Sequence, residues 1–155
     1  MPIVCSVTLK TWKGHPTRAV GFLAHSDVSF VNVSEVFNRL GEDVRDYFRT
    51  SFDYFLEDLT LTKYPHRYHG WKKTVERGIY QHCFVFKCPP HRLYGFLCHP
   101  KGMEDGRFYA CALVLHAEKL KWLTDKEELK RVNKMREDAE VLKAIRWPWK
   151  EDKKK

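Results

Sequence analysis

Long apolar runs are missing from this sequence of 155 residues. No stretch approaches the roughly 18 apolar residues that a membrane-spanning helix requires, so we expect no membrane association. The first residues, MPIVCSVTLK, place no basic group ahead of a hydrophobic segment. This argues against a cleaved signal peptide and makes the cytoplasm the expected compartment.

Motifs for nucleotide binding and for structural zinc are also lacking. The chain contains neither GxxxxGK(S/T) nor GxGxxG, the loops that cradle nucleotide phosphates. Its five cysteines include no CxxC pair and fall mostly inside apolar stretches, which predicts buried free thiols rather than disulfides or zinc ligands. Acidic residues are scarce in 79–116, which disfavours a site of paired carboxylates. We therefore expect no metal and no cofactor.

Positive charge, in contrast, is plentiful and unevenly distributed. The formal net charge is +8. Residues 1–62 carry 6 basic against 8 acidic side chains, residues 63–116 carry 9 against 3, and residues 117–155 carry 13 against 9. A polyanion is the natural partner of such a surface. The alternative is a basic surface that only keeps the protein soluble.

The hydrophobic pattern predicts one domain over residues 1–146, followed by a disordered basic tail, 147–155. Apolar runs at 3–9 and 18–24 predict a hairpin and the run 28–33 a third strand, so that residues 1–33 add strands to the fold. Apolar residues then recur at helical spacing. Ser34 is the candidate N-cap of this helical region, and Gly41 divides it into a short and a longer helix.

Three further apolar runs, 79–88, 91–98 and 107–116, predict an antiparallel meander over 79–116. Pro89–Pro90 forces a turn between the first two, and short connections favour antiparallel neighbours. Thr124 begins the sequence TDKE, a capping box that predicts the start of a C-terminal helix. The expected fold class is α+β, with helices covering one face of an antiparallel sheet.

Basic and aromatic side chains share faces of these predicted strands. Arg92 alternates onto the same face as Tyr94, while His82 lies with aromatic residues and Lys87 lies on the opposite face of its strand. Bases stack on aromatic rings and guanidinium planes, and cations neutralise phosphates, so this mixture suits RNA. In the alternative interpretation, Arg92 and His82 only mark strand ends or a hydrogen-bonded rim.

The chain from about Val33 to Asp138 resembles the RelE/HigB-like toxins of bacterial and phage toxin–antitoxin systems. The matching stretches, about two-thirds of the chain in all, include YHGWKKTVERGIYQHC, HRLYGFL and ALVLHAEKLKWLTDKEELKRVNKMRED. They follow the family's order of helical segment, loop, strands and basic helix. Gln81-His82-Cys83 replaces the charged triplet of the family, and the first 25–30 residues or so have no counterpart in the minimal toxin.

This resemblance implies a RelE-like microbial RNase fold and metal-independent cleavage of mRNA on the ribosome, with a cognate antitoxin protein as partner. In such chemistry the 2′-hydroxyl attacks the adjacent phosphate, assisted by a base, an acid and a basic cluster. Arg92 falls on the family's strand arginine, and His82 and His116 are the candidate acid and base. The residues assigned to RNA or phosphate binding are Lys87, Tyr94, Lys119 and Lys121.

Two other functions fit the same residues. A basic module would bind RNA or the ribosome without cleaving it, and a protein-interaction domain would carry the charge incidentally. A steep loss of RNA affinity with salt separates the nuclease and the RNA-binding module from the protein-interaction domain, because phosphate contacts release counterions. Cleavage separates the enzyme from the binding module.

Overall fold

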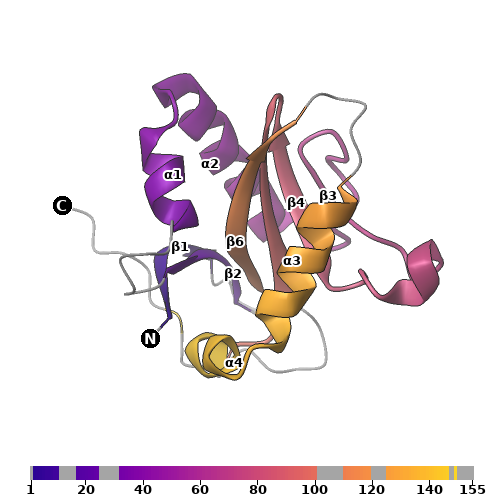
Figure 1. Ribbon diagram of the computed structural model, residues 1–155. Coiled ribbons are helices and arrows are strands. Elements are labelled where there is room, and N and C mark those ends of the chain that lie inside the picture. Colours follow the sequence, from indigo (N-terminus) through magenta and orange to yellow (C-terminus); the bar gives the residue numbers. More distant parts are fainter. Residues whose placement is uncertain are drawn as a thin grey trace.

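The computed structural model describes residues 2–10, 17–24, 32–100, 110–119, 125–146 and 149. Within them, six strands form one sheet and four α-helices pack on it, which confirms the predicted α+β class (Figure 1). The strands are β1 (Ile3–Lys10), β2 (Arg18–Ala24), β3 (Tyr68–Gly70), β4 (Cys83–Cys88), β5 (His91–Cys98) and β6 (Ala110–Glu118). The helices are α1 (Val33–Arg39), α2 (Glu42–Glu57), α3 (Lys126–Glu137) and α4 (Ala139–Arg146), with a 3-10 turn, η1, at Val75–Gly78.

The sheet is mixed, whereas the sequence predicts an antiparallel one. Its strand order is β1-β2-β6-β5-β4-β3. Neighbouring strands pair antiparallel except β2 and β6, which run parallel, with Ala19 opposite Ala110 and Phe22 opposite Leu113. This parallel pairing joins the N-terminal hairpin to the strands of the second half of the chain.

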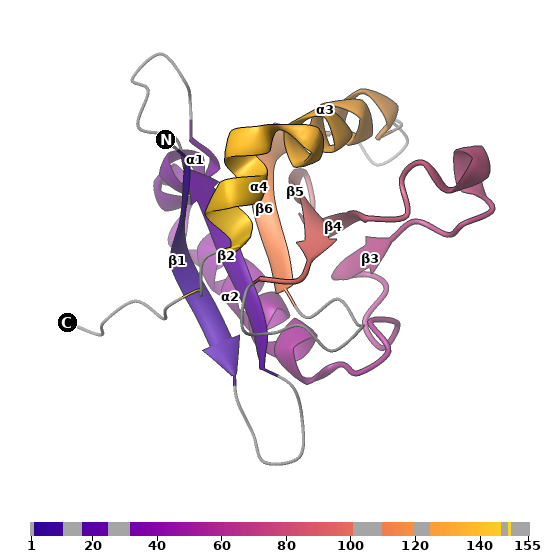
Figure 2. The same cartoon turned by 90° about the horizontal axis from the view of Figure 1, so that it is seen from below.

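Helices lie on both faces of the sheet, which corrects the expectation that they cover one face (Figure 2). Alternating side chains of the strands therefore enter two separate cores. The core beneath α1 and α2 is built largely of aromatic rings, including Phe22, Phe37, Phe48, Phe52, Phe55, Phe84 and Phe86. The core beneath α3 and α4 includes Val85, Tyr94, Phe96, Leu129, Val132, Val141 and Ile145.

The start of β4 differs from the prediction. The strand begins at Cys83 rather than at residue 79. Main-chain hydrogen bonds from Gln81 N to Gly78 O (3.1 Å) and from Cys83 N to Tyr80 O (2.9 Å) close successive turns before it. The apolar residues ahead of Cys83 therefore belong to the turns that follow η1.

The predicted N-cap of the first helix is wrong by two residues. α1 begins at Val33, and its N-cap is Asn32 rather than Ser34. The third strand predicted over 28–33 therefore does not extend to residues 32 and 33, and the rest of it lies outside the described residues. The division at Gly41 is confirmed, since this glycine is the N-cap of α2.

The sequence predicts one C-terminal helix after Thr124, but Asp138 divides this helical region into α3 and α4. The Asp138 carboxylate accepts hydrogen bonds from the main-chain N–H groups of Glu140 (2.9 Å) and Val141 (3.2 Å), and α4 starts there. The N-cap of α3 is Asp125, and the predicted cap Thr124 lies outside the described residues. Within the segment predicted as a tail, Trp149 is buried on the core beneath α3 and α4.

Candidate phosphate-binding site

Basic side chains from β4, β5 and the end of β6 meet at one end of the sheet. β4 and β5 are joined by the turn at Pro89–Pro90, and their register places Lys87 directly opposite Arg92. Directly paired residues project from the same face of a sheet, so the two cations lie side by side. The main-chain N–H of Lys119 donates to the carbonyl oxygen of Pro90 (2.8 Å), which brings this residue to the same turn.

These residues line a pocket of about 500 Å³, which we call the Arg92 pocket. This volume falls in the range of roughly 300–1,000 Å³ that is typical of ligand sites. The lining residues are His66, His69, Lys87, Pro89, Pro90, His91, Arg92, Lys119 and Asp125. Three of them are cations and one is a carboxylate, so these four side chains carry a net positive charge and the pocket favours an anion.

Arg92 is oriented by two partners inside this pocket. Its Nη1 lies 2.5 Å from Oδ1 of Asp125 and 3.5 Å from the hydroxyl of Tyr94, which itself donates to Asp125. Burial opposes the charge of Arg92, but Tyr94 and Asp125 outweigh it and raise the pKa of the guanidinium. Because these contacts engage Nη1, the other donors of the planar fork can bind an anion.

The two lysines of the pocket are also held by acceptors. Lys87 Nζ donates to the carbonyl oxygen of Pro65 (3.1 Å), and burial, followed by repulsion from Arg92, lowers the pKa of Lys87. Lys119 Nζ lies 2.6 Å from Oε1 of Glu128, and both side chains of this ion pair are largely buried. The cations are therefore fixed in place, which lowers the entropy lost when they bind a ligand.

His69 enters the pocket from β3 and is not among the residues predicted from the sequence. Its Nδ1 lies 3.0 Å from the carbonyl oxygen of Gly70. A carbonyl only accepts, so Nδ1 carries the proton and Nε2 is the basic nitrogen of the neutral ring. Burial lowers the pKa of His69. The hydrogen bond to Gly70 raises this pKa, whereas the positive charges of Lys87 and Arg92 lower it. The ring is therefore neutral at pH 7.

His91 also lines the pocket, and it contacts the predicted site residue His116. Its Nδ1 lies 3.0 Å from Nε2 of His116 and 3.8 Å from Oε1 of Glu118. His116 pairs with Leu93 in the β5–β6 register, so it projects from the face opposite to that of Arg92. The structure therefore places His116 behind His91 rather than among the residues that line the Arg92 pocket.

The remaining predicted residues are distributed as follows. Tyr94 lies beside Arg92 and contacts Asp125. His82 precedes β4, at the end opposite to Pro89–Pro90, where its carbonyl oxygen accepts a hydrogen bond from the N–H of Leu97 (2.7 Å). Lys121 lies outside the described residues. The pocket thus gathers Lys87, Arg92 and Lys119 with Tyr94 behind them, but not His82.

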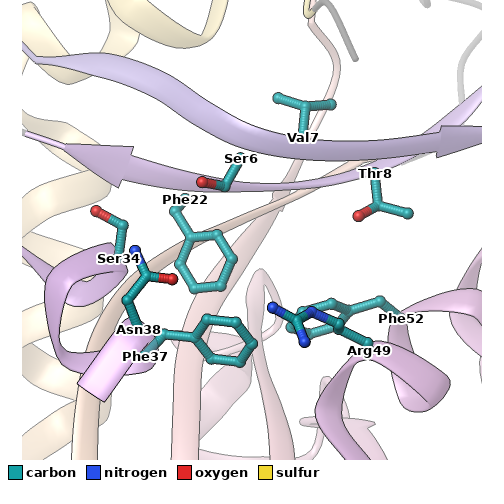
Figure 3. Close-up of a pocket in the computed structure, with 9 residues that line it drawn as sticks. All are labelled: Ser6, Val7, Thr8, Phe22, Ser34, Phe37, Asn38, Arg49 and Phe52. Carbon is teal, nitrogen blue, oxygen red and sulfur yellow. The ribbon is translucent and has the colours of Figure 1, made fainter. Parts of the chain in front are cut away.

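A smaller pocket of about 250 Å³ lies between β1–β2 and α1–α2 (Figure 3). Three phenylalanines, Phe22, Phe37 and Phe52, line it, but these residues are only 3–5% exposed and belong to the core. The cation that lines it, Arg49, is paired with Asp46 at 3.3 Å. This pocket offers a ligand little accessible surface, so the Arg92 pocket is the stronger candidate site.

No protein-family model, curated protein or solved structure matches this chain. Among the described residues, no group of three or more His, Cys, Asp or Glu side chains is arranged to hold a metal ion. The helices within the described ranges are too short or too polar to cross a membrane.

Proposed function

We propose that the protein is an endoribonuclease that cleaves mRNA on the ribosome, as the toxin of a toxin–antitoxin pair. The observation that carries this proposal is the convergence of Lys87, Arg92 and Lys119 on one pocket that also contains two half-buried histidines. Cations stabilise the charge on a phosphate, and imidazoles transfer protons near neutral pH. The resemblance to RelE/HigB-like toxins adds the ribosome and the antitoxin to the proposal.

The proposed reaction is an internal attack within the RNA. The 2′-hydroxyl oxygen attacks the adjacent phosphorus and the bond to the 5′-oxygen breaks, which leaves a 2′,3′-cyclic phosphate and a 5′-hydroxyl. Nε2 of neutral His69 accepts the proton of the attacking hydroxyl. His91, as the imidazolium, donates a proton to the leaving 5′-oxygen. Both rings exchange protons with water afterwards, which restores the starting state without a metal or a cofactor.

In this proposal the three cations bind the phosphate and stabilise its transition state. Arg92 is the main clamp, because its planar fork matches two phosphate oxygens. Lys87 and Lys119 approach from the neighbouring strands as point charges. Removing one preorganised donor from such a site costs about 10²–10³ in turnover rate.

A second candidate function is RNA binding without cleavage. One observation favours it, namely the ion pair of 2.5 Å between Arg92 and Asp125. This contact neutralises part of the charge that a transition state would require. If the pair of Arg92 and Asp125 stays intact while RNA is bound, the protein would hold RNA through Lys87 and Lys119 and would not cleave it.

The experiment is an in vitro translation reaction on a defined mRNA, in which new 5′ ends are mapped. We expect cuts that are in register with the codons and that require ribosomes. The cleavage rate should fall about 10²-fold or more with Arg92→Ala, and Arg92→Lys should retain only part of the wild-type rate. Lys143→Ala is the matched control, since it removes one positive charge from the exposed face of α4, where Lys143 Nζ lies 3.9 Å from Oε1 of Glu140. Intact mRNA in a translating reaction with the wild-type protein would exclude the nuclease and leave RNA binding as the function.

A further inference from the structure

Two histidines face each other across β5 and β6 at the edge of the Arg92 pocket. Nδ1 of His91 and Nε2 of His116 are 3.0 Å apart, and the ring centroids are 5.2 Å apart with the planes tilted by 34°. A separation of 3.0 Å between ring nitrogens is a hydrogen bond, so one of these two atoms carries a proton and the other accepts it.

The two rings belong to different pockets. His91 lines the Arg92 pocket, whereas His116 lines a separate pocket of about 390 Å³ with Val36, Arg131, Lys134 and Met135, among others. A phosphate held by Lys87 and Arg92 would therefore contact His91 and not His116. Any effect of His116 on the bound RNA has to pass through the ring of His91.

The surroundings of the pair decide which nitrogen donates. Oε1 of Glu118 lies 3.8 Å from Nδ1 of His91, and a carboxylate favours a proton on the nitrogen that it faces. Burial, followed by the neighbouring His91, lowers the pKa of His116, so its ring is neutral and has one nitrogen that accepts. The Glu118 carboxylate thus favours the proton on His91 Nδ1, and a neutral His116 ring is able to accept it at Nε2.

We infer that His116 is a positioning residue, whose Nε2 accepts a hydrogen bond from Nδ1–H of His91 and so aims Nε2 of His91 at the RNA in the Arg92 pocket. This inference rests on the proposed function, in which His91 is the general acid. His91 keeps its Nδ1 proton both as the imidazolium and after it has given up the Nε2 proton. The contact to His116 therefore holds the orientation of the ring through the reaction.

Other charged groups face this pair and contribute to its pH dependence. Glu118 lies next to His91 on the paired strand. The remaining groups share a pocket with one of the two rings: Lys87, Arg92, Lys119 and Asp125 on the side of His91, and Arg131 and Lys134 on the side of His116. Protonated His116 would lose its acceptor nitrogen, so acid pH uncouples the pair.

The kinetic test compares two substitutions of His116 in steady-state cleavage. His116→Phe keeps an aromatic ring but removes the acceptor, and we expect kcat to fall about 10–100-fold with KM unchanged, as for other partners that orient a functional histidine. His116→Gln restores an acceptor through its amide oxygen, and most of the rate should return. His99→Gln is the control, because this histidine follows β5 at the end opposite to the pocket. An unchanged kcat and pH profile in a folded His116→Phe protein would overturn the inference.

A second measurement separates this inference from the proposed function. The nitrogen chemical shifts of the imidazole rings report the tautomer of each histidine in the free protein, without RNA. We expect neutral His91 to carry its proton on Nδ1 in the wild type and to show a mixture of tautomers in His116→Phe. Wild-type protein with the proton on Nε2 would refute the positioning role. If the protein cleaves no RNA, the catalytic use of the pair fails with the proposed function, while the shifts still decide whether His116 fixes the tautomer.

Discussion

Asp125, the N-cap residue of α3, forms an ion pair of 2.5 Å with Arg92 of β5. The same carboxylate accepts a hydrogen bond from Tyr94, so it links the start of a helix to two side chains on one face of β5. Asp125 therefore orients the guanidinium and also competes with any phosphate that approaches it.

The substitution Asp125→Asn tests this competition. Asparagine keeps an oxygen that accepts from Tyr94, but it removes the negative charge that faces Arg92. We expect the affinity for a short single-stranded RNA to rise several-fold, which corresponds to about 1 kcal/mol. Fluorescence anisotropy measures the change, and Glu140→Gln, the same charge change on exposed α4, serves as control. Weaker binding by Asp125→Asn would mean that the carboxylate helps more by positioning than it hinders by charge.

A prediction about salt concerns Lys87. Each phosphate contact to single-stranded RNA contributes about −0.7 to the slope of log K against log salt, so three cations in the pocket give a slope of roughly −2. Lys87→Ala should make this slope shallower by about 0.7, whereas Lys143→Ala should leave it unchanged. Binding titrations at several salt concentrations measure both slopes. Equal slopes for the wild type and Lys87→Ala would remove Lys87 from the RNA-binding surface.

The acid stability of the protein should depend on Asp58, at the C-terminal end of α2. Its buried carboxylate accepts hydrogen bonds from the Tyr68 hydroxyl (2.7 Å) and from the main-chain N–H of Lys63 (2.9 Å). Burial raises the pKa of Asp58, but these hydrogen bonds and those from Thr60 outweigh it and leave the pKa lowered from 3.8. The stabilisation is therefore complete above the unfolded pKa and is lost as the pH falls through the folded one.

Tyr68→Phe tests this network. Losing a hydrogen bond to a charged group should lower the free energy of unfolding by about 1.5–3 kcal/mol at pH 7. The loss should begin to shrink as the pH falls below about 4, the unfolded pKa, and should vanish below the lowered folded pKa, where Asp58 is protonated in both states. Acid unfolding should begin at a higher pH than in the wild type. Urea titrations at several pH values measure this dependence. Tyr54→Phe, which removes a hydroxyl from the same aromatic cluster, should show no such pH dependence.

Gly95, which adjoins the bulge between β5 and β6, should tolerate no side chain. The β5–β6 register shifts between Tyr94 and Gly95, and a Cβ atom at Gly95 would lie 2.2 Å from the carbonyl oxygen of Ala112. Gly95→Ala should destabilise the protein by about 1–3 kcal/mol, because the backbone of one strand has to move. It should also weaken RNA binding, since Arg92 precedes the bulge. Thermal unfolding measures the first effect, and Gly41→Ala, with nothing within 4 Å, should change stability by less than about 1 kcal/mol.

The sequence predicts the local elements of this fold better than their arrangement. The turn at Pro89–Pro90 and the hairpin of the first strands are confirmed, because short connections leave few alternatives. The parallel pairing of β2 with β6 was not predicted, since it joins residues about ninety positions apart and leaves no local pattern. The packing of α1 and α2 on one face and of α3 and α4 on the other also depends on contacts between distant segments.

The residues of the candidate site are likewise easier to predict one by one than as an arrangement. Lys87 and Arg92 were predicted separately, but only the register of β4 and β5 shows that they share a face. His69 and Asp125 come from β3 and from the start of α3, and no spacing relates them to Arg92. His91 adjoins Arg92 in the sequence, yet strand alternation places neighbours on opposite faces. His91 reaches the pocket because it lies at the very end of its strand, next to the turn.

The parallel contact between β2 and β6 has a practical consequence for shortened forms of the protein. A chain that starts at Asn32 would keep α1 and the strands that form the Arg92 pocket, but residues 110–113 of β6 would lose their neighbour. A bare strand edge of apolar residues recruits strands from other molecules. Such a shortened chain should therefore self-associate, and its light scattering should rise with concentration even where the pocket itself is intact.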